Sequence, residues 1–227
     1  MFAAETLQVA ASWILPILFA ITLHEAAHAI AAYRLGDDTA YRLGRVSLNP
    51  LRHVDPFGTV LLPALLFFSN APFLIGWAKP VPVAFGKLRH PRRDMVLVAL
   101  AGPATNIVLA IVSALLFHFL WLLPDQAIPW AARILYQSIL LNLVLALFNM
   151  LPIPPLDGGR VAVGLLPDVI AGPLAHLERY GLAVLLAIVF LLPFLGRQIG
   201  LDLNVLRWAV GVPLQWLLPL FRGLAGI

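Results

Sequence analysis

Long apolar runs alternate with short polar connectors along most of this chain. Five of the runs are continuous enough to predict helices, at about 9–33, 95–123, 131–150, 180–195 and 203–221. A helix of about 20 apolar residues crosses the hydrocarbon core of a bilayer, and a helix satisfies its own backbone hydrogen bonds there. The pattern therefore predicts an all-α polytopic membrane protein with about five transmembrane helices.

A sixth apolar run, at 57–77, is less regular than the others. Pro63 and the turn-like Ser69-Asn70-Ala71-Pro72 interrupt it. Its length allows a sixth span, whereas its interruptions equally favour a re-entrant hairpin that enters the membrane and returns. Short extended segments are expected in the connectors on either side, at Tyr41-Arg42-Leu43 and in the proline-rich stretch 78–83.

The composition agrees with a membrane protein. The 227 residues are 61% hydrophobic and 11% charged, with a mean hydropathy of +0.93, whereas a soluble domain is about half apolar and about a quarter charged. The length suits a single membrane-embedded domain, 1–227. A net charge of +4 does not indicate a nucleic-acid partner. Because residues 1–11 include no Lys or Arg, we expect no cleavable signal peptide.

Inside the first run stands the motif His24-Glu25-Ala26-Ala27-His28. Residues four apart on a helix differ by about 40° in rotation and about 6 Å in rise, so the two imidazoles can bind one metal ion. Glu25 is one residue further round, where it can take a proton from a metal-bound water. Three ionisable side chains so close together in a membrane helix indicate function. The alternative is a polar seam against a neighbouring helix.

A catalytic zinc site usually has three protein ligands and one open position. The chain has no cysteine, so the third ligand must be His, Asp or Glu. Asp157 is the best candidate, because it follows the third span in a proline-rich stretch and precedes Gly158-Gly159, where the backbone can bend tightly. The alternative is an aspartate that starts an ordinary Asp-Gly turn.

Three motifs in this order resemble the site-2 protease family of membrane-embedded zinc metalloproteases. They are the His-Glu-Ala-Ala-His motif, Gly102-Pro103-x-x-Asn106, and Asn149-x-x-Pro152-x-Pro154-x-Leu156-Asp157-Gly158. The segment 76–83 further resembles the compact bacterial-type members. We see no stretch that is long enough for a PDZ domain and no C-terminal nucleotide-sensing module. The resemblance implies a protease core at about 9–160 and accessory helices at about 178–224.

The resemblance also implies a mechanism. One Zn²⁺ per chain is held by His24, His28 and Asp157, and Glu25 is the general base that activates water for peptide-bond hydrolysis. The substrates implied are single-span or other membrane proteins, cleaved within or near the lipid bilayer. Asn106 and Asn149 are candidates for binding the substrate backbone or the oxyanion, and helix–helix hydrogen bonding is the alternative for both. Arg160 is expected to anchor the chain at the membrane surface.

The position of Asp157 favours re-entry of 57–77. The motif lies toward the end of the first span and Asp157 follows the end of the third, so the ligands converge only if an even number of crossings separates those ends. Re-entry also places the basic residues of 79–93 on the same side as those of 34–52, as the positive-inside tendency requires. We therefore expect a bacterial cytoplasmic membrane protein with its active site toward the cytoplasm.

Two other classes of protein stay open. A membrane metal transporter would also use intramembrane His and Asp, but it would need several sets of ligands along a path, and the sequence indicates one. A relative without activity that binds membrane proteins would have no need of Glu25.

Overall fold

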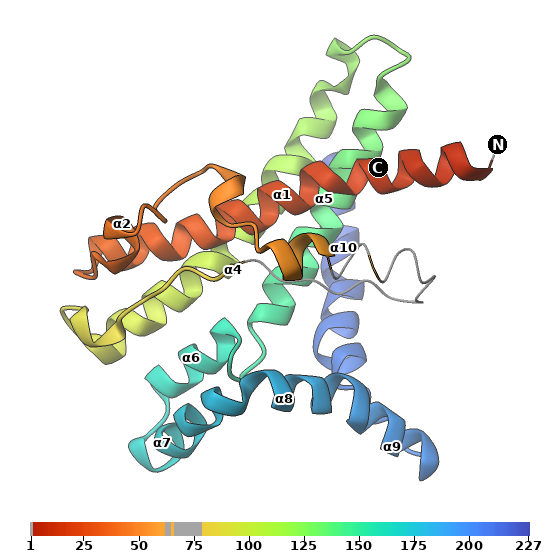
Figure 1. Ribbon diagram of the computed structural model, residues 1–227. Coiled ribbons are helices and arrows are strands. Elements are labelled where there is room, and N and C mark those ends of the chain that lie inside the picture. Colours follow the sequence, from red (N-terminus) through yellow and green to blue (C-terminus); the bar gives the residue numbers. More distant parts are fainter. Residues whose placement is uncertain (1, 62–64, 66–78) are drawn as a thin grey trace.

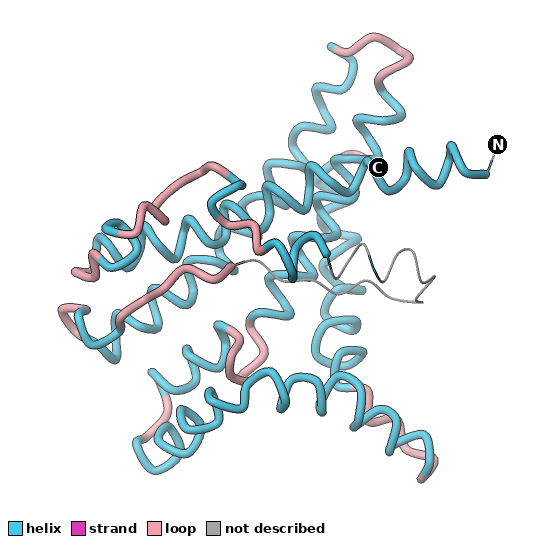
Figure 2. Tube along the Cα trace, in the orientation of Figure 1, coloured by secondary structure: helices cyan, strands magenta, loops and turns pink. Residues whose placement is uncertain are grey.

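The computed structural model describes residues 2–61, 65 and 79–227, and this part of the chain is helical without strands (Figure 1 and Figure 2). The longer helices are α1 (Phe2–Arg34), α4 (Pro91–Leu116), α5 (Ile128–Asn149) and α10 (Val212–Ala225). The shorter ones are α2 (Thr39–Arg42), α6 (Asp157–Leu165), α7 (Asp168–His176), α8 (Gly181–Leu186) and α9 (Leu192–Gln198). Single 3₁₀ turns and π-helical segments are η1 (Pro50–Arg52), η2 (Pro56–Leu61), η3 (Phe85–Lys87), η4 (Phe117–Leu122), η5 (Leu177–Tyr180), η6 (Ala187–Leu191) and η7 (Arg207–Gly211).

Four helical runs of the described residues are long and apolar enough to cross a membrane. They are Ala11–Arg34, Pro91–Leu122, Ile128–Asn149 and Asp168–Gln198. The fourth begins earlier than the apolar run at 180–195, because α7, η5, α8, η6 and α9 follow one another without a break. The expected fifth span is also helical, as η7 and α10, but it is not among these four. The protein is an all-α polytopic membrane protein, as predicted.

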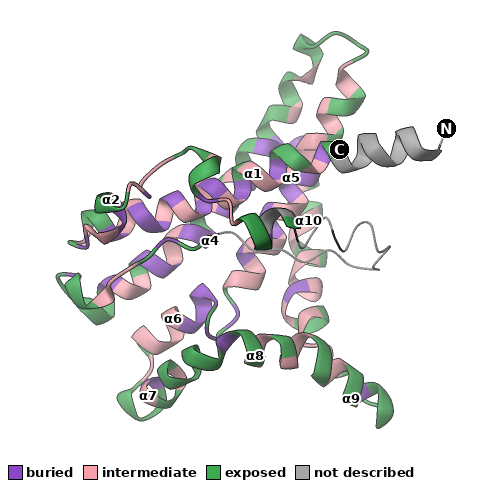
Figure 3. Ribbon diagram, viewed as in Figure 1, coloured by how far each residue is buried: buried purple, intermediate pink, exposed green. Residues whose placement is uncertain are grey.

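The core lies where α1, α4 and α5 pack against one another. Buried residues gather at this crossing, whereas α7 to α9 are largely exposed (Figure 3). Small side chains allow the close packing: Ala110 and Ala114 of α4 lie against Ile139 and Leu143 of α5, with Ala225 of α10 in the same cluster. Small residues at helix contacts are typical of membrane bundles, where helix association depends on close van der Waals packing.

The buried face of α1 contains both histidines of the motif. Ala20, His24, His28 and Ala32 follow one another at intervals of four residues, and each has at most 8% of its surface exposed. Residues at this spacing lie on the same side of a helix. The two alanines leave room for neighbouring helices on either side of the histidines, so the motif faces the interior of the bundle.

One buried carboxylate organises the connector after α1. Asp37 accepts hydrogen bonds from the backbone N of Thr39 (3.0 Å), from its Oγ1 (2.5 Å) and from the backbone N of Ala84 (2.6 Å). Burial would raise the pKa of Asp37, but these hydrogen bonds and nearby Lys87 outweigh it and lower the pKa. The extended chain predicted at Tyr41-Arg42-Leu43 is wrong, because the Asp37 side chain stabilises a turn that begins helix α2.

The two ends of the segment that contains the irregular apolar run lie side by side. The backbone N of Lys79 donates to the carbonyl of His53 at 2.9 Å. The buried guanidinium of Arg45 donates to carbonyl groups on both sides, that of Arg52 and that of Lys79. The run 57–77 itself lies largely outside the described residues, so its re-entry stays a prediction.

Replacing Asp37 should destabilise the fold. We expect Asp37→Ala to lower the free energy of unfolding by about 1–3 kcal/mol, because the N–H groups of Thr39 and Ala84 lose their acceptor. Thermal unfolding in detergent micelles measures the loss. Asp38→Ala is the matched control, because Asp38 pairs with Arg42 at the surface, where ion pairs contribute little. Equal losses in the two variants would contradict the role given to Asp37.

The same experiment has a pH dependence. The folded-state pKa of Asp37 is lowered. The contribution of its carboxylate to the free energy of unfolding is therefore fully present above the unfolded-state pKa of about 4. That contribution is lost as the pH falls through the folded-state value. Acid should therefore destabilise the wild-type protein more than Asp37→Ala.

Labelling from each side of sealed vesicles tests the re-entrant run. The chain has no cysteine, so single cysteines can be placed at the exposed positions Asn49 and Lys87. Since His53 and Lys79 are hydrogen-bonded neighbours, both cysteines should react with an impermeant maleimide from the same side. Reaction from opposite sides would mean that 57–77 crosses the membrane.

Candidate metal centre

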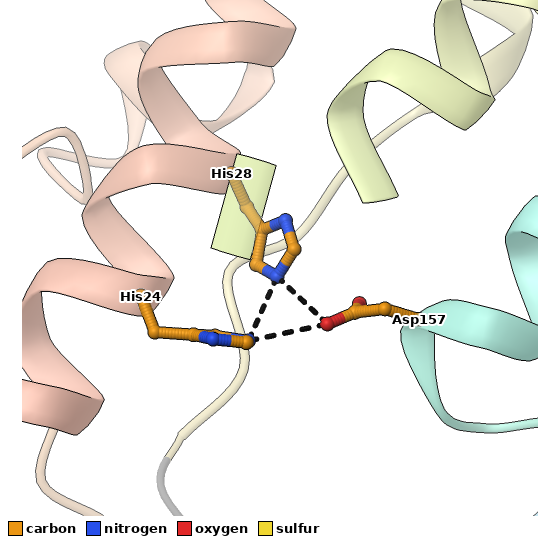
Figure 4. A group of neighbouring side chains, drawn as sticks. All are labelled: His24, His28 and Asp157. Atoms are coloured by element: carbon orange, nitrogen blue, oxygen red, sulfur yellow. Dashed lines mark hydrogen bonds and ion pairs between the residues drawn. The ribbon is translucent and has the colours of Figure 1, made fainter. Parts of the chain in front are cut away.

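Two histidines and one aspartate from distant parts of the chain meet in the core (Figure 4). Nε2 of His24 and Nε2 of His28 are 3.0 Å apart, and Oδ2 of Asp157 lies 3.2 Å from the first and 3.3 Å from the second. All three side chains are buried. The histidines come from α1 and Asp157 from the first residue of α6, so the structure brings together the three residues that the sequence analysis selected as ligands.

The turn between α5 and α6 aims Asp157 at the histidines. Helix α5 ends at Asn149, and the proline-rich stretch 150–156 turns the chain back on itself. A Cβ at Gly158 would lie 2.3 Å from the carbonyl oxygen of Met150 and 2.4 Å from that of Leu151. Only glycine fits against that turn. Gly158 therefore lets the start of α6 pack directly against the backbone of Met150 and Leu151.

The donor set fits a zinc ion. Zinc bonds of about 2.0–2.2 Å in a tetrahedron hold ligand atoms about 3.3–3.6 Å apart, within a few tenths of an ångström of the observed separations. Oδ2 of Asp157 is buried and accepts no hydrogen bond, as expected for an oxygen that binds a metal.

The other nitrogen of each imidazole has a polar partner. Nδ1 of His28 lies 2.7 Å from the carbonyl oxygen of Val98, and Nδ1 of His24 lies 2.6 Å from Oδ1 of Asn106. A carbonyl only accepts hydrogen bonds, so Nδ1 of His28 carries a proton, and Nε2 of the neutral ring presents a lone pair. Such outer contacts orient metal ligands and tune their basicity.

Asn106 is fully buried and bonded at both ends. Its Oδ1 faces His24, and its Nδ2 donates to Oδ1 of Asn142 in α5 at 2.8 Å. The sequence analysis did not single out Asn142. The available signal was an amide side chain within an apolar span, which is costly unless it is paired.

Helix α4 approaches the histidines through a glycine. A Cβ at Gly102 would lie 2.4 Å from Nε2 of His28 and 2.6 Å from Nε2 of His24. Any side chain here would occupy the space in front of the two nitrogens that face Asp157. The glycine of the Gly-Pro-x-x-Asn motif therefore keeps that space open.

Glu25 stands beside the cluster without joining it. Its Oε2 accepts a hydrogen bond from the backbone N of Val81 at 2.7 Å. Among the described residues, the only group that can hold a metal ion is the trio of His24, His28 and Asp157. Glu25 and that trio line a common cavity of about 400 Å³, which places a carboxyl group that is not a candidate ligand next to the three residues that are.

The cavity wall contains two further polar side chains. Asn149 lines it, with Nδ2 donating to the carbonyl of Leu145 at 3.0 Å. Arg160 also lines it, which the sequence did not indicate. Its guanidinium lies 5.1 Å from the ring centre of Phe85 and donates to Glu178 at 3.0 Å. Extended chain from Pro80 to Val83 forms another part of the wall.

Comparisons with known proteins identify relatives that are named as zinc metalloproteases. The family model described as "Peptidase family M50" matches residues 122–192. The "Putative zinc metalloprotease YwhC" of Bacillus subtilis (strain 168) is 39% identical over 184 residues, which cover 79% of this chain and 80% of that protein. The "Putative zinc metalloprotease Rip2" of Mycobacterium tuberculosis (strain H37Rv) is 32% identical over 211 residues, 91% of this chain and 74% of that protein. No solved structure matches.

Gly102→Ala should weaken metal binding. The added methyl group must displace one of the two rings, and overpacking of this kind costs about 1–3 kcal/mol, equivalent to about 5- to 150-fold in affinity. Competition with a chromophoric chelator measures the affinity of the purified protein for zinc. Gly172→Ala is the control, because nothing lies within 4 Å of a Cβ at that helical glycine. Unchanged affinity in Gly102→Ala would contradict the close approach of α4.

Proposed function

The chain belongs to peptidase family M50, the site-2 protease family, and on that premise we propose that it hydrolyses peptide bonds of membrane-spanning proteins. The observation that carries this proposal is the placement of Glu25. A metal-binding protein without activity needs only the three ligands, whereas here a second carboxyl group, that of Glu25, lines the same cavity. A carboxylate beside a metal site is what a metalloprotease requires for proton transfer.

In this proposal His24, His28 and Asp157 hold one zinc ion per chain. Bound zinc would lower the pKa of a water molecule to about 7 and polarise the scissile carbonyl. Glu25 accepts the proton of the attacking water and returns it to the leaving amine nitrogen. The N–H of Val81 holds Oε2 of Glu25, so one oxygen is oriented and the other is left for the proton.

The cavity wall supports a site for unwound substrate. A transmembrane helix must open before cleavage, because its carbonyl groups are already hydrogen-bonded. The extended segment 80–83 borders the cavity, and an extended substrate can add to such a segment through main-chain hydrogen bonds. The N–H groups of Val81 and Ala84 already donate to Glu25 and Asp37. Main-chain pairing with a substrate therefore falls to the other backbone groups of this segment. Asn149 is the amide we assign to the substrate backbone or the oxyanion.

Asn106 is less suited to that role. It has no exposed surface and both ends of its amide are bonded within the protein. We therefore propose that Asn106 holds His24 by a hydrogen bond between helices, which is the alternative role given in the sequence analysis.

The distribution of basic residues supports an active site near the cytoplasmic side of a bacterial cytoplasmic membrane. The backbone N of Arg89, just before α4, donates to the carbonyl of Leu35, just after α1, at 3.0 Å. The basic residues of both connectors therefore lie at the end of α1 that contains the motif. Lys and Arg near span ends favour the cytoplasmic side.

A membrane metal transporter is the competing function. Transport requires further ligand sets along a path, and the described residues contain one group able to hold a metal. An assay with a verified substrate separates an enzyme from a transporter or a relative without activity.

Glu25→Gln gives the sharpest test. It keeps the size of the side chain and removes the base, so peptide cleavage should fall at least 10²-fold, the scale of general acid–base catalysis. The measurement is cleavage of a single-span substrate by purified protein, with and without a zinc chelator. Zinc binding should persist, because Glu25 is not one of the three ligands.

Asp157→Ala is the matched comparison for Glu25→Gln. It should lose zinc as well as cleavage. Wild-type cleavage by Glu25→Gln would show that the mechanism is wrong, and loss of zinc from that variant would make Glu25 a ligand.

A further inference from the structure

A continuous chain of buried hydrogen bonds leads away from His24 through two other helices. Nδ1 of His24 bonds Oδ1 of Asn106 in α4 at 2.6 Å, and Nδ2 of Asn106 donates to Oδ1 of Asn142 in α5 at 2.8 Å. Nδ2 of Asn142 then donates to the backbone carbonyl of Ser138 at 2.8 Å. Asn106 is 0% exposed and Asn142 is 1% exposed, so solvent does not supply alternative partners.

The last member determines the direction of every bond in this chain. A backbone carbonyl can only accept, so the group of Asn142 that faces Ser138 must be its NH₂. The oxygen of Asn142 therefore faces Asn106 and can only accept. The NH₂ of Asn106 must point toward that oxygen, which leaves the oxygen of Asn106 for His24.

The consequence for His24 follows from the same reasoning. An amide oxygen only accepts, so the neutral imidazole must carry its proton on Nδ1. Its Nε2 then presents a lone pair toward His28 and Asp157. His28 obtains the same tautomer directly from the carbonyl of Val98, whereas His24 depends on two side-chain amides that could each turn by 180°.

We propose that Asn142 and Asn106 are positioning residues that together select the metal-binding tautomer of His24. This inference rests on the proposed function only in taking His24 as a metal ligand. Asn142 touches neither the metal ligands nor the cavity. It acts through Asn106, by preventing the amide of Asn106 from turning its NH₂ toward the imidazole. In the turned state Nε2 of His24 would carry the proton and could not bind a metal.

The competing explanation is that the two asparagines only hold α4 against α5. The protein contains a control for that role, because Oγ of Ser113 in α4 and Oγ of Ser138 in α5 are 2.8 Å apart. This bond joins the same two helices, but a hydroxyl can rotate and transmits no fixed direction to His24. Oγ of Ser138 also accepts a longer bond of 3.3 Å from Nδ2 of Asn142, which adds to the 2.8 Å bond to the Ser138 carbonyl. Ser113→Ala therefore removes an interhelical bond, while the backbone carbonyl of Ser138 still accepts from Asn142 and keeps the tautomer of His24 unchanged.

The test compares zinc affinities of the purified full-length protein by chelator competition. Asn142→Leu should weaken zinc binding by about 10-fold or more, within the 10- to 100-fold range for groups that orient metal ligands. Ser113→Ala should stay within about twofold of wild type. Equal losses in these two variants would overturn the proposal in favour of helix packing.

A second comparison uses Asn106→Asp. A carboxylate has no N–H to turn toward His24, so it keeps Nδ1 protonated whatever residue stands at 142. In the Asn106→Asp background, Asn142→Leu should therefore change zinc affinity by no more than about twofold, the scatter of independent sites. An undiminished loss in that background would overturn the proposal, because it would show that Asn142 does not act through the orientation of Asn106.

Nitrogen-15 spectra of histidine-labelled, metal-free protein, recorded at a pH high enough for His24 to be neutral, read the tautomer directly, with the signals of His24 assigned by their loss in His24→Gln. Wild type and Ser113→Ala should carry the proton on Nδ1 of His24, and Asn142→Leu should show a mixture of tautomers. A single Nδ1–H tautomer in Asn142→Leu would overturn the proposal. These readouts need no substrate, so a protein that gives them without cleaving peptides would contradict the proposed function alone.

Discussion

Every polar group inside an apolar helical bundle needs a partner, and the rest of this structure depends on that constraint. Burying an unpaired polar group costs several kcal/mol, and burying an unpaired charge costs more. Two imidazoles and one carboxylate nevertheless meet within 3.3 Å in the core. The second nitrogen of each imidazole bonds an oxygen from α4. The remaining lone pairs converge on one point, which is the arrangement that a zinc ion would complete.

Close approach of the helices is what makes this pairing possible. Helix α4 must come near enough to supply both Asn106 and the carbonyl of Val98, and it does so where Gly102 lies against the rings. The turn after α5 must come equally near to deliver Asp157, and Gly158 allows that. The motifs therefore combine ligands with glycines for one physical reason, since a ligand reaches the centre only where the backbone beside it has no side chain.

The connectors between the helices position Glu25, the remaining group of the site. The segment before η3 supplies the N–H of Val81 to Glu25, and it is held by Asp37 on one side and by Arg45 on the other. Both are buried charges outside the three central helices, and both bond backbone groups. The general base of the proposed mechanism is thus oriented by loops, while the metal ligands are oriented by helices.

The sequence by itself determined the features that depend on local spacing. Apolar runs of sufficient length predicted the main helices, and the four-residue interval placed His24 and His28 on one face, because helix geometry is the same in any context. Only the tertiary structure decided that Asn142 supports Asn106 and that α2 replaces an extended segment. Those outcomes depend on the register in which helices pack and on hydrogen bonds between residues far apart in sequence. Neither leaves a periodic signal in the chain.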